Sequence, residues 1–162
     1  MKYLKILNET ISDGVGLRLS IYLSGCSHHC PYCHNESSWN ENNGYDLDDG
    51  VIENIVTTYQ NNPMLSGITF TGGDPLFNFK EFTYLIKKIK LALNCNIWVY
   101  TGYTYEQIKN EEFIYYIDVL VDGKFEIKSR CLSLYFRGSK NQRIIDVKSS
   151  LIKSSIKIIN FE

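Results

Sequence analysis

Cysteines are the residues with the clearest chemistry in this sequence. Three of the five, Cys26, Cys30 and Cys33, are crowded into the segment Gly-Cys-Ser-His-His-Cys-Pro-Tyr-Cys-His-Asn at 25–35. Cys95 and Cys131 stand alone and are expected to pack as small apolar groups. An odd, clustered set is not the pattern of a secreted disulfide framework. In a reducing cytosol such a cluster more often binds a metal or carries out redox chemistry.

Three of the four chemistries that fit this segment have a specific weakness. A structural zinc site needs a fourth ligand, which His28, His29, His34 or a distant cysteine would have to supply. A c-type haem fits Cys30-Pro-Tyr-Cys33-His34, but that attachment normally occurs outside the cytosol and the sequence has no export signal. A glutaredoxin-like dithiol of Cys30 and Cys33 leaves Cys26 without a role.

An iron–sulfur cluster is the fourth possibility, because closely spaced thiolates on a flexible loop are its natural ligands. Three cysteines can hold three corners of a four-iron cluster. The missing fourth protein ligand then leaves one iron open to a substrate or cofactor, as in catalytic metal sites in general.

Other polar and glycine residues follow segments that have the pattern of β-strands. Strict alternation of apolar residues predicts a strand over 17–23, and β-rich segments follow at 67–71, 95–101 and 117–122. Helical spacing is found at 48–61 and 78–93, and a shorter helix is expected from Thr104. The chemically interesting residues after the strands are Cys26, Cys30, Cys33, Gly72, Gly73, Asp74, Thr101, Gly102, Asp122 and Lys124.

Strands that alternate with helices predict an α/β fold with a parallel sheet. We expect a partial (β/α) TIM-like barrel with an open side, because the chain is too short for eight complete units. Further strands are expected at 133–136 and 143–147. The carboxyl ends of parallel strands form one rim, so the residues that follow them should lie together.

Length and composition favour a single domain over 1–162, with a core at about 14–147 and a C-terminal tail at 148–162. The 162 residues are 44% hydrophobic, which excludes intrinsic disorder, and no apolar stretch is long enough to span a membrane. A cytoplasmic protein is expected. The net charge of −1 conceals an asymmetry: residues 1–123 carry 8 basic and 15 acidic side chains, whereas 124–162 carry 9 and 3. This basic quarter suits an acidic partner or a solvated face, and direct nucleic-acid binding is not expected.

The Cys-x3-Cys-x2-Cys loop after a first strand resembles that of the radical S-adenosylmethionine enzymes. Later segments resemble the activating proteins of anaerobic ribonucleoside-triphosphate reductases, a glycyl-radical branch of that superfamily. They are Gly-Gly-Asp-Pro-Leu at 72–76, Val-Asp-Gly-Lys-Phe at 121–125 and Arg-Gly-Ser-Lys-Asn-Gln-Arg-Ile-Ile-Asp at 137–146. The resemblance extends in order from residue 14 to about 147.

The resemblance implies a role for each site residue. Cys26, Cys30 and Cys33 would bind a [4Fe-4S] cluster, and Tyr32 and His34 would lie beside the cluster and the adenine of S-adenosylmethionine. Gly72 and Gly73 would let the backbone approach the cofactor, and Asp74 would accept a hydrogen bond from the methionine ammonium. Thr101, Asp122 and Lys124 would bind the ribose hydroxyls and the methionine carboxylate. The sequence does not assign roles to Arg137 and Arg143, and it favours exposed positions for the three histidines.

The implied function is reductive cleavage of S-adenosylmethionine to a 5′-deoxyadenosyl radical, which generates a glycyl radical on the large anaerobic (class III) reductase. That large subunit would dock on an open rim, and an external donor such as reduced flavodoxin would supply the electron. A homodimer is compatible with the sequence. Activation of another glycyl-radical enzyme and a radical reaction on a small molecule remain alternatives, as do the zinc-binding module and the thiol oxidoreductase.

Overall fold

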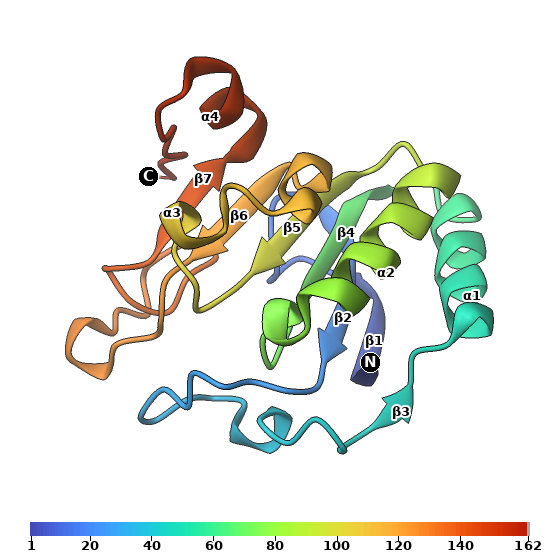
Figure 1. Ribbon diagram of the computed structural model, residues 1–162, viewed down its shortest axis with the longest axis horizontal. Helices are drawn as coiled ribbons and strands as arrows, with labels where there is room; N and C mark the ends of the chain where they lie inside the picture. The colour runs from blue at the N-terminus through green and yellow to red at the C-terminus, as the bar shows by residue number, and fades with distance from the viewer. Residues whose placement is uncertain (162) are drawn as a thin grey trace.

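The computed structural model describes residues 1–161 and contains one open, mixed β-sheet (Figure 1). Seven strands form this sheet in the order β3-β1-β2-β4-β5-β6-β7. Their bounds are β1 Lys2–Thr10, β2 Leu17–Leu23, β3 Tyr45–Asp46, β4 Leu65–Gly72, β5 Asn96–Tyr100, β6 Val119–Asp122 and β7 Arg143–Asp146.

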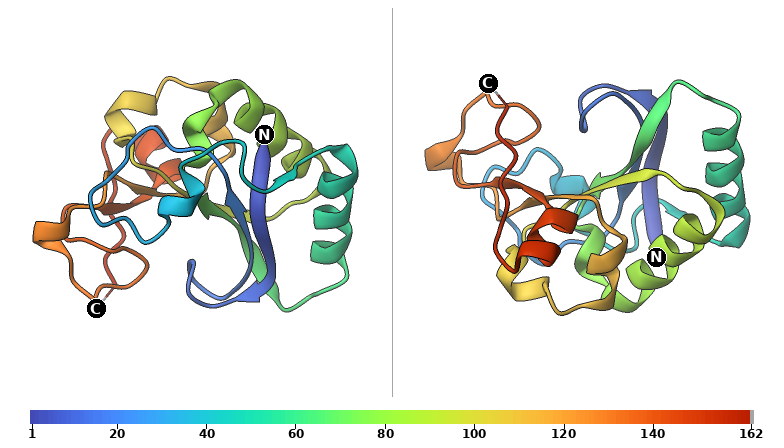
Figure 2. Two further views of the ribbon diagram at one scale, coloured as in Figure 1. Left: turned by 90° about the horizontal axis from the view of Figure 1, so that it is seen from below. Right: turned by 90° about the horizontal axis from the view of Figure 1, so that it is seen from above.

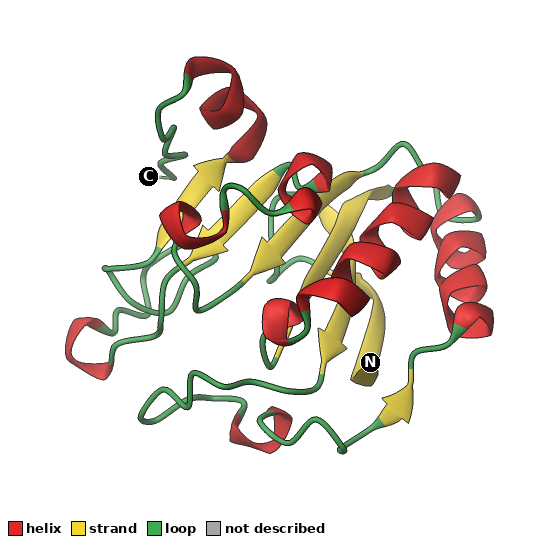
Figure 3. Ribbon diagram, viewed as in Figure 1, coloured by secondary structure: helices red, strands yellow, loops and turns green. Residues whose placement is uncertain are grey.

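Helices cover one face of the sheet, as the two views of Figure 2 show. The α-helices are α1 Asp49–Gln60, α2 Phe79–Ala92, α3 Tyr105–Ile108 and α4 Val147–Lys153. Short 3-10 helices lie at Glu36–Ser38, Pro75–Phe77, Glu112–Tyr116 and Ile127–Ser129. Most of them interrupt the long connections that are green in Figure 3. Over the described residues, none of these helices combines the length and the apolar character required to cross a membrane.

The apolar pattern of the sequence explains the core. Leu19, Ile21 and Leu23 of β2 are at most 1% exposed and pack with the buried faces of α1 and α2. The predicted helix starts are also present. The side chain of Asn78 caps α2 by accepting a hydrogen bond from the Glu81 amide, and Thr104 begins α3 with a capping box.

Four neighbouring strands, β2, β4, β5 and β6, run parallel to one another. Their carboxyl ends therefore lie at one edge of the sheet, where the loops after Leu23, Gly72, Tyr100 and Asp122 begin. We call this edge the rim. Its existence confirms the prediction that the residues after these strands share one side of the molecule.

The predicted partial TIM-like barrel is wrong. β1 pairs antiparallel with β2 and β3, and β7 pairs antiparallel with β6, so three of the six strand pairings in the sheet are antiparallel. The edge strands β3 and β7 are not paired with each other, and the sheet stays open. Two connections explain the difference. β1 joins β2 through the short loop 11–16, and the chain leaves β6 through the loop 123–142, which lacks the crossover helix that a parallel strand requires.

The expected strand at 133–136 is also absent, because these residues form turns within the loop 123–142. Phe136 instead packs edge-on against Trp98 at a ring separation of 5.5 Å. Both belong to a second, smaller apolar cluster on the sheet face opposite the helices, together with Val119, Val121 and Ile144. The segment after α4 returns to this face, where the Ile159 amide donates to the Ile144 carbonyl.

Candidate cofactor site at the rim of the sheet

The cysteine-bearing segment is the first rim loop, which we define as residues 24–35. Its start is fixed by backbone hydrogen bonds from Gly25 to the Ser38 carbonyl and from Cys26 to the Trp39 carbonyl. His29 and Tyr32 have left-handed backbone conformations, with φ of 46° and 60°, so the chain turns sharply between the cysteines. The loop thus keeps the three cysteines at the rim, as predicted.

All three thiols of this loop are free and partly exposed. Over residues 1–161 they do not converge into a ready-made group of metal ligands. Burial raises the pKa of Cys26, and hydrogen bonds from the backbone amides of His28 and His29 offset part of this increase. Burial also raises the pKa of Cys30, an effect that the Phe125 amide and Lys124 partly offset. Because thiolates are the form that binds iron, loading these two cysteines must release protons.

The turn Gly72-Gly73-Asp74 after β4 lies directly against the cysteine loop. The Gly73 amide donates to the Leu23 carbonyl and the Asp74 amide to the Gly25 carbonyl, both at 2.8 Å. A Cβ atom on Gly73 would lie 2.5 Å from the Gly25 oxygen, closer than real contacts allow. Gly73 therefore lets the turn approach the cysteine loop, and Gly72, with φ of 107°, lets it approach Leu23 at the end of β2.

Asp74 is buried at the centre of the rim, with 2% of its surface exposed. Its Oδ1 accepts hydrogen bonds from the Leu76 amide at 2.8 Å and from the Thr101 hydroxyl at 2.9 Å. Its Oδ2 accepts one from the Gly102 amide at 2.9 Å and lies equally close, at 2.9 Å, to the Thr101 hydroxyl. Asp74 and Thr101, which the sequence assigned to one site, are therefore in direct contact.

His28 completes the surroundings of this carboxylate, a position that the sequence did not predict. Its Nε2 lies 2.7 Å from Asp74 Oδ2, and its side chain is only 9% exposed. The imidazole packs edge-on against Tyr103, with 4.7 Å between the ring centres. The expectation of an exposed histidine is wrong here because a hydrogen-bonding group and a flat packing surface are both available at the rim.

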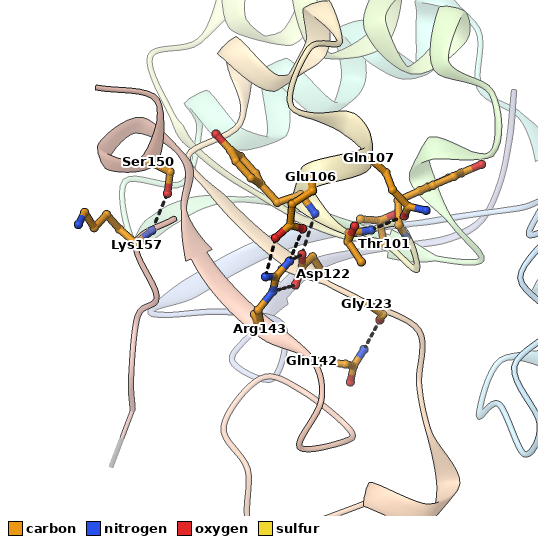
Figure 4. Close-up of polar contacts among 12 residues, drawn as sticks. Thr101, Glu106, Gln107, Asp122, Gly123, Gln142, Arg143, Ser150 and Lys157 are labelled. Carbon is orange, nitrogen blue, oxygen red and sulfur yellow. Dashed lines mark hydrogen bonds and ion pairs between the residues drawn. The ribbon is translucent and has the colours of Figure 1, made fainter. Parts of the chain in front are cut away.

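Asp122, at the end of β6, binds other residues of the chain. Its buried carboxylate accepts from Arg143 Nε at 3.0 Å and from the Tyr105 amide at 2.8 Å (Figure 4). Arg143 also forms a bidentate pair with Glu106, which lowers the pKa of that carboxyl to about 2. This ion-pair network joins β6, α3 and β7, and it gives Arg143 a structural role.

The loop 123–142 borders the cysteine loop on its other side. The aromatic rings of Phe125 and His34 are 6.2 Å apart. Lys124 is exposed, yet its charge acts on Cys30 and so places it beside the cysteine loop. Tyr32 is 74% exposed and packs little against the protein. Arg137 lies within the loop, where its Nη1 donates to the Gln142 carbonyl.

The donor set of the rim fits an iron–sulfur cluster. The carboxylate nearest the cysteines, that of Asp74, is occupied by donors from the chain, and His28 and His29 are engaged with Asp74 and Trp39. Three free thiols and the exposed His34 then remain as the uncommitted ligands of the loop. Soft thiolates in this number are typical of iron–sulfur chemistry.

Comparison with known proteins gives one consistent result. The family model described as a 4Fe-4S single cluster domain matches residues 12–145. The chain is 35% identical over 147 residues to the anaerobic ribonucleoside-triphosphate reductase-activating protein of enterobacteria phage T4, a match that covers 89% of this chain and 93% of the phage protein. The protein of the same name from Haemophilus influenzae is 35% identical over 150 residues, covering 89% and 97%. That of Escherichia coli K12 is 34% identical over 148 residues, covering 88% and 96%.

Proposed function

Because this chain belongs to the family of anaerobic ribonucleoside-triphosphate reductase-activating proteins, we propose that it generates a glycyl radical on the large subunit of a class III ribonucleotide reductase. Cys26, Cys30 and Cys33 would hold a [4Fe-4S] cluster at the rim. When bound and reduced, this cluster supplies the electron that cleaves S-adenosylmethionine to methionine and a 5′-deoxyadenosyl radical, which removes a hydrogen atom from a glycine of the partner. The observation that carries the proposal is the contact between the cysteine loop and the Gly-Gly-Asp turn.

The chain's own residues would bind and orient the cofactor. The turn 72–74 would face the methionine ammonium, and Thr101 would hold the ribose hydroxyls. Lys124, whose charge acts on Cys30, would bind the methionine carboxylate. Tyr32 and His34 would flank the adenine. Asp122 is left out of this set, since Arg143 and the Tyr105 amide occupy its carboxylate.

The competing chemistries receive less support from the site. A glutaredoxin-like dithiol requires a thiol with a lowered pKa, whereas burial raises the pKa of Cys30. A structural zinc site requires a fourth ligand. His28 and His29 are engaged with Asp74 and Trp39, which leaves the exposed His34 as the histidine available for it. Activation of another glycyl-radical enzyme, or a reaction on a small molecule, would be indicated by cleavage of S-adenosylmethionine without a radical on the reductase in the experiment below.

An external one-electron donor is the second proposed partner. The positive charge of the loop 123–142 favours a donor protein with an acidic surface. The five cations of this loop form no ion pair within the described part of the chain, in contrast to Arg143 and Lys148. They are Lys124, Lys128, Arg130, Arg137 and Lys140. Because this loop contacts the cysteine loop, a negatively charged carrier bound there would be close to the cluster.

The experiment is anaerobic reconstitution with iron and sulfide, followed by reaction with S-adenosylmethionine, dithionite and the large reductase subunit. We predict 5′-deoxyadenosine and a glycyl radical detected by electron paramagnetic resonance (EPR). Cys26→Ala, Cys30→Ala and Cys33→Ala should each abolish 5′-deoxyadenosine formation, whereas Cys95→Ala and Cys131→Ala should retain it. Activity in any of the first three variants would refute the assignment of the ligands. Cleavage without a radical on the reductase would instead indicate another substrate.

A further inference from the structure

We propose that His28 is a positioning residue of the cofactor site, through which the cysteine loop is fastened to Asp74. This inference rests on the proposed function and adds a residue to it. Three of the donors around Asp74 belong to the turn 74–76 or to the segment after β5, namely Leu76, Thr101 and Gly102. His28 is the polar neighbour of this carboxylate that comes from the loop carrying the cysteines.

The acceptor capacity of the carboxylate explains why the fourth donor matters. A carboxylate offers about four lone-pair positions. In Asp74 the Leu76 amide donates to Oδ1, the Gly102 amide donates to Oδ2, and the Thr101 hydroxyl lies 2.9 Å from both oxygens. His28 Nε2 is the fourth polar group around the carboxylate, 2.7 Å from Oδ2. With 2% of the residue exposed, water has little access to replace a missing donor. Loss of the imidazole would leave a buried charge short of one partner.

The surroundings of the ring are shaped for an imidazole. Tyr103 packs against it edge-on, and a Cβ atom on Gly102 would lie 2.4 Å from its Cδ2. Glycine at 102 is therefore needed for the ring to reach Asp74. Nε2 is buried and lies 2.7 Å from Asp74 Oδ2, a close polar contact, and it has no well-directed hydrogen bond to any described residue.

The contact between His28 and Asp74 matters for the site because of where His28 lies in the chain. His28 lies between Cys26 and Cys30, so its anchor fixes two ligand-bearing segments relative to the turn that is proposed to face S-adenosylmethionine. The backbone hydrogen bonds of Gly25 and Cys26 restrain the start of the loop, and the Asn35 side chain, which donates to the Gly72 carbonyl at 3.3 Å, restrains its end. His28 is the contact that holds the middle of the loop, between Cys26 and Cys30. Without the anchor, the cluster would still assemble from three thiols, but its distance from the cofactor would no longer be set.

Two variants and one control test the anchor. His28→Ala removes it, His28→Gln keeps an N–H donor of similar reach, and His29→Asn alters the adjacent histidine, which stacks on Trp39 and has a left-handed backbone that asparagine tolerates. For His28→Ala we expect the iron content of the wild type, S-adenosylmethionine binding weaker by at least about tenfold, and loss of the cofactor-induced change in the EPR spectrum of the reduced cluster. His28→Gln should restore much of the binding, and His29→Asn should bind as the wild type does.

Gly102→Ala provides an independent route to the same effect, because the added methyl group would displace the imidazole while leaving His28 in the sequence. In the iron-free protein, His28→Ala should also accelerate hydrogen exchange of the Gly102 amide, which donates to the same carboxylate oxygen. This measurement requires neither cluster nor activity.

The outcomes separate the two proposals. Wild-type protein that fails to bind S-adenosylmethionine after reconstitution would overturn the proposed function. Wild-type binding with unchanged affinity in both His28→Ala and Gly102→Ala would overturn the anchor alone. Tighter binding in His28→Ala would also overturn it, since the imidazole would then be a competitor that the methionine ammonium displaces.

Discussion

The buried carboxylate of Asp122 accepts hydrogen bonds from Arg143 and from the Tyr105 amide. Asp122→Asn removes the charge that this arginine faces, at a cost of about 1–3 kcal/mol in the free energy of unfolding, moderated by the partial exposure of Arg143. Binding of S-adenosylmethionine to the reconstituted protein should stay within about twofold of the wild type, since no proposed contact is lost. Denaturant titration and equilibrium dialysis measure the two effects. Normal stability with lost cofactor binding would return Asp122 to the cofactor site.

Cysteine reactivity in the iron-free protein follows from opposite pKa shifts. The Ser133 hydroxyl and amide lower the pKa of Cys131, whereas burial raises the pKa of Cys26 and Cys30. At neutral pH, Cys131 therefore has the largest thiolate fraction of the three, and iodoacetamide should label it first. Labelling of Cys26 and Cys30 should go on increasing at pH values where labelling of Cys131 has already levelled off. Peptide mass spectrometry checks the order, and earlier labelling of either rim cysteine would contradict it.

The sequence predicted which residues belong to the site more reliably than it predicted which side chains they contact. The cysteine spacing and the Gly-Gly-Asp turn were sufficient to predict that Asp74 and Thr101 share a site, because both follow parallel strands. His28 and the Asp122–Arg143 pair were missed, because they depend on which side chains meet across loops far apart in sequence. A histidine between two cysteines carries no sequence signal for burial.

The elements of the rim depend on close contact between the cysteine loop and the turn after β4. Gly73→Ala would place a methyl group against the Gly25 and Ser38 carbonyl oxygens, at 2.5 and 2.9 Å. We expect the variant to be destabilised by about 1–3 kcal/mol and to bind S-adenosylmethionine less well, because the loop must move away. Gly50→Ala, in the first turn of α1, is the control and should match or exceed wild-type stability. Full stability of Gly73→Ala would mean that the contact is not required.

The local elements were predicted well where a periodic pattern met a clear boundary, as in β2, α1, α2 and β7. β1 was missed because its side chains are half-buried or exposed along its whole length, which leaves no strict alternation. The segment 133–136 had a strand-like composition, but Phe136 packs against Trp98 from a loop. Tertiary contacts decided its conformation.

For the whole molecule, the open sheet and the charge asymmetry are the two features with functional consequences. The barrel was predicted from strand and helix alternation, which does not reveal that β1, β3 and β7 are antiparallel. The open arrangement leaves the loop 123–142 at one end of the sheet, beside the cysteine loop (Figure 1). The five cations of this loop are thereby brought to the same side of the molecule as the proposed cluster.

Electrostatic docking of the electron donor predicts a distinctive kinetic pattern. The triple variant Lys128→Glu, Arg130→Glu and Lys140→Glu should slow cluster reduction by an acidic flavoprotein about 10- to 100-fold at low ionic strength, with a smaller effect at high salt. Dithionite, a small reductant, should reduce it as fast as the wild type. Lys153→Glu, on α4, should behave as the wild type with both reductants. An equal loss with dithionite would show damage to the site, and no loss with the flavoprotein would place the docking surface elsewhere.

The central claim is that three cysteine thiolates bind a four-iron cluster and leave one iron for S-adenosylmethionine. EPR of the reconstituted, reduced protein, recorded with and without S-adenosylmethionine labelled with ¹⁷O in its carboxylate, tests it directly. The account predicts a four-iron signal whose shape changes on cofactor addition and which couples to the label. A four-iron signal that does not respond to the cofactor, or a protein that binds no cluster, would contradict it.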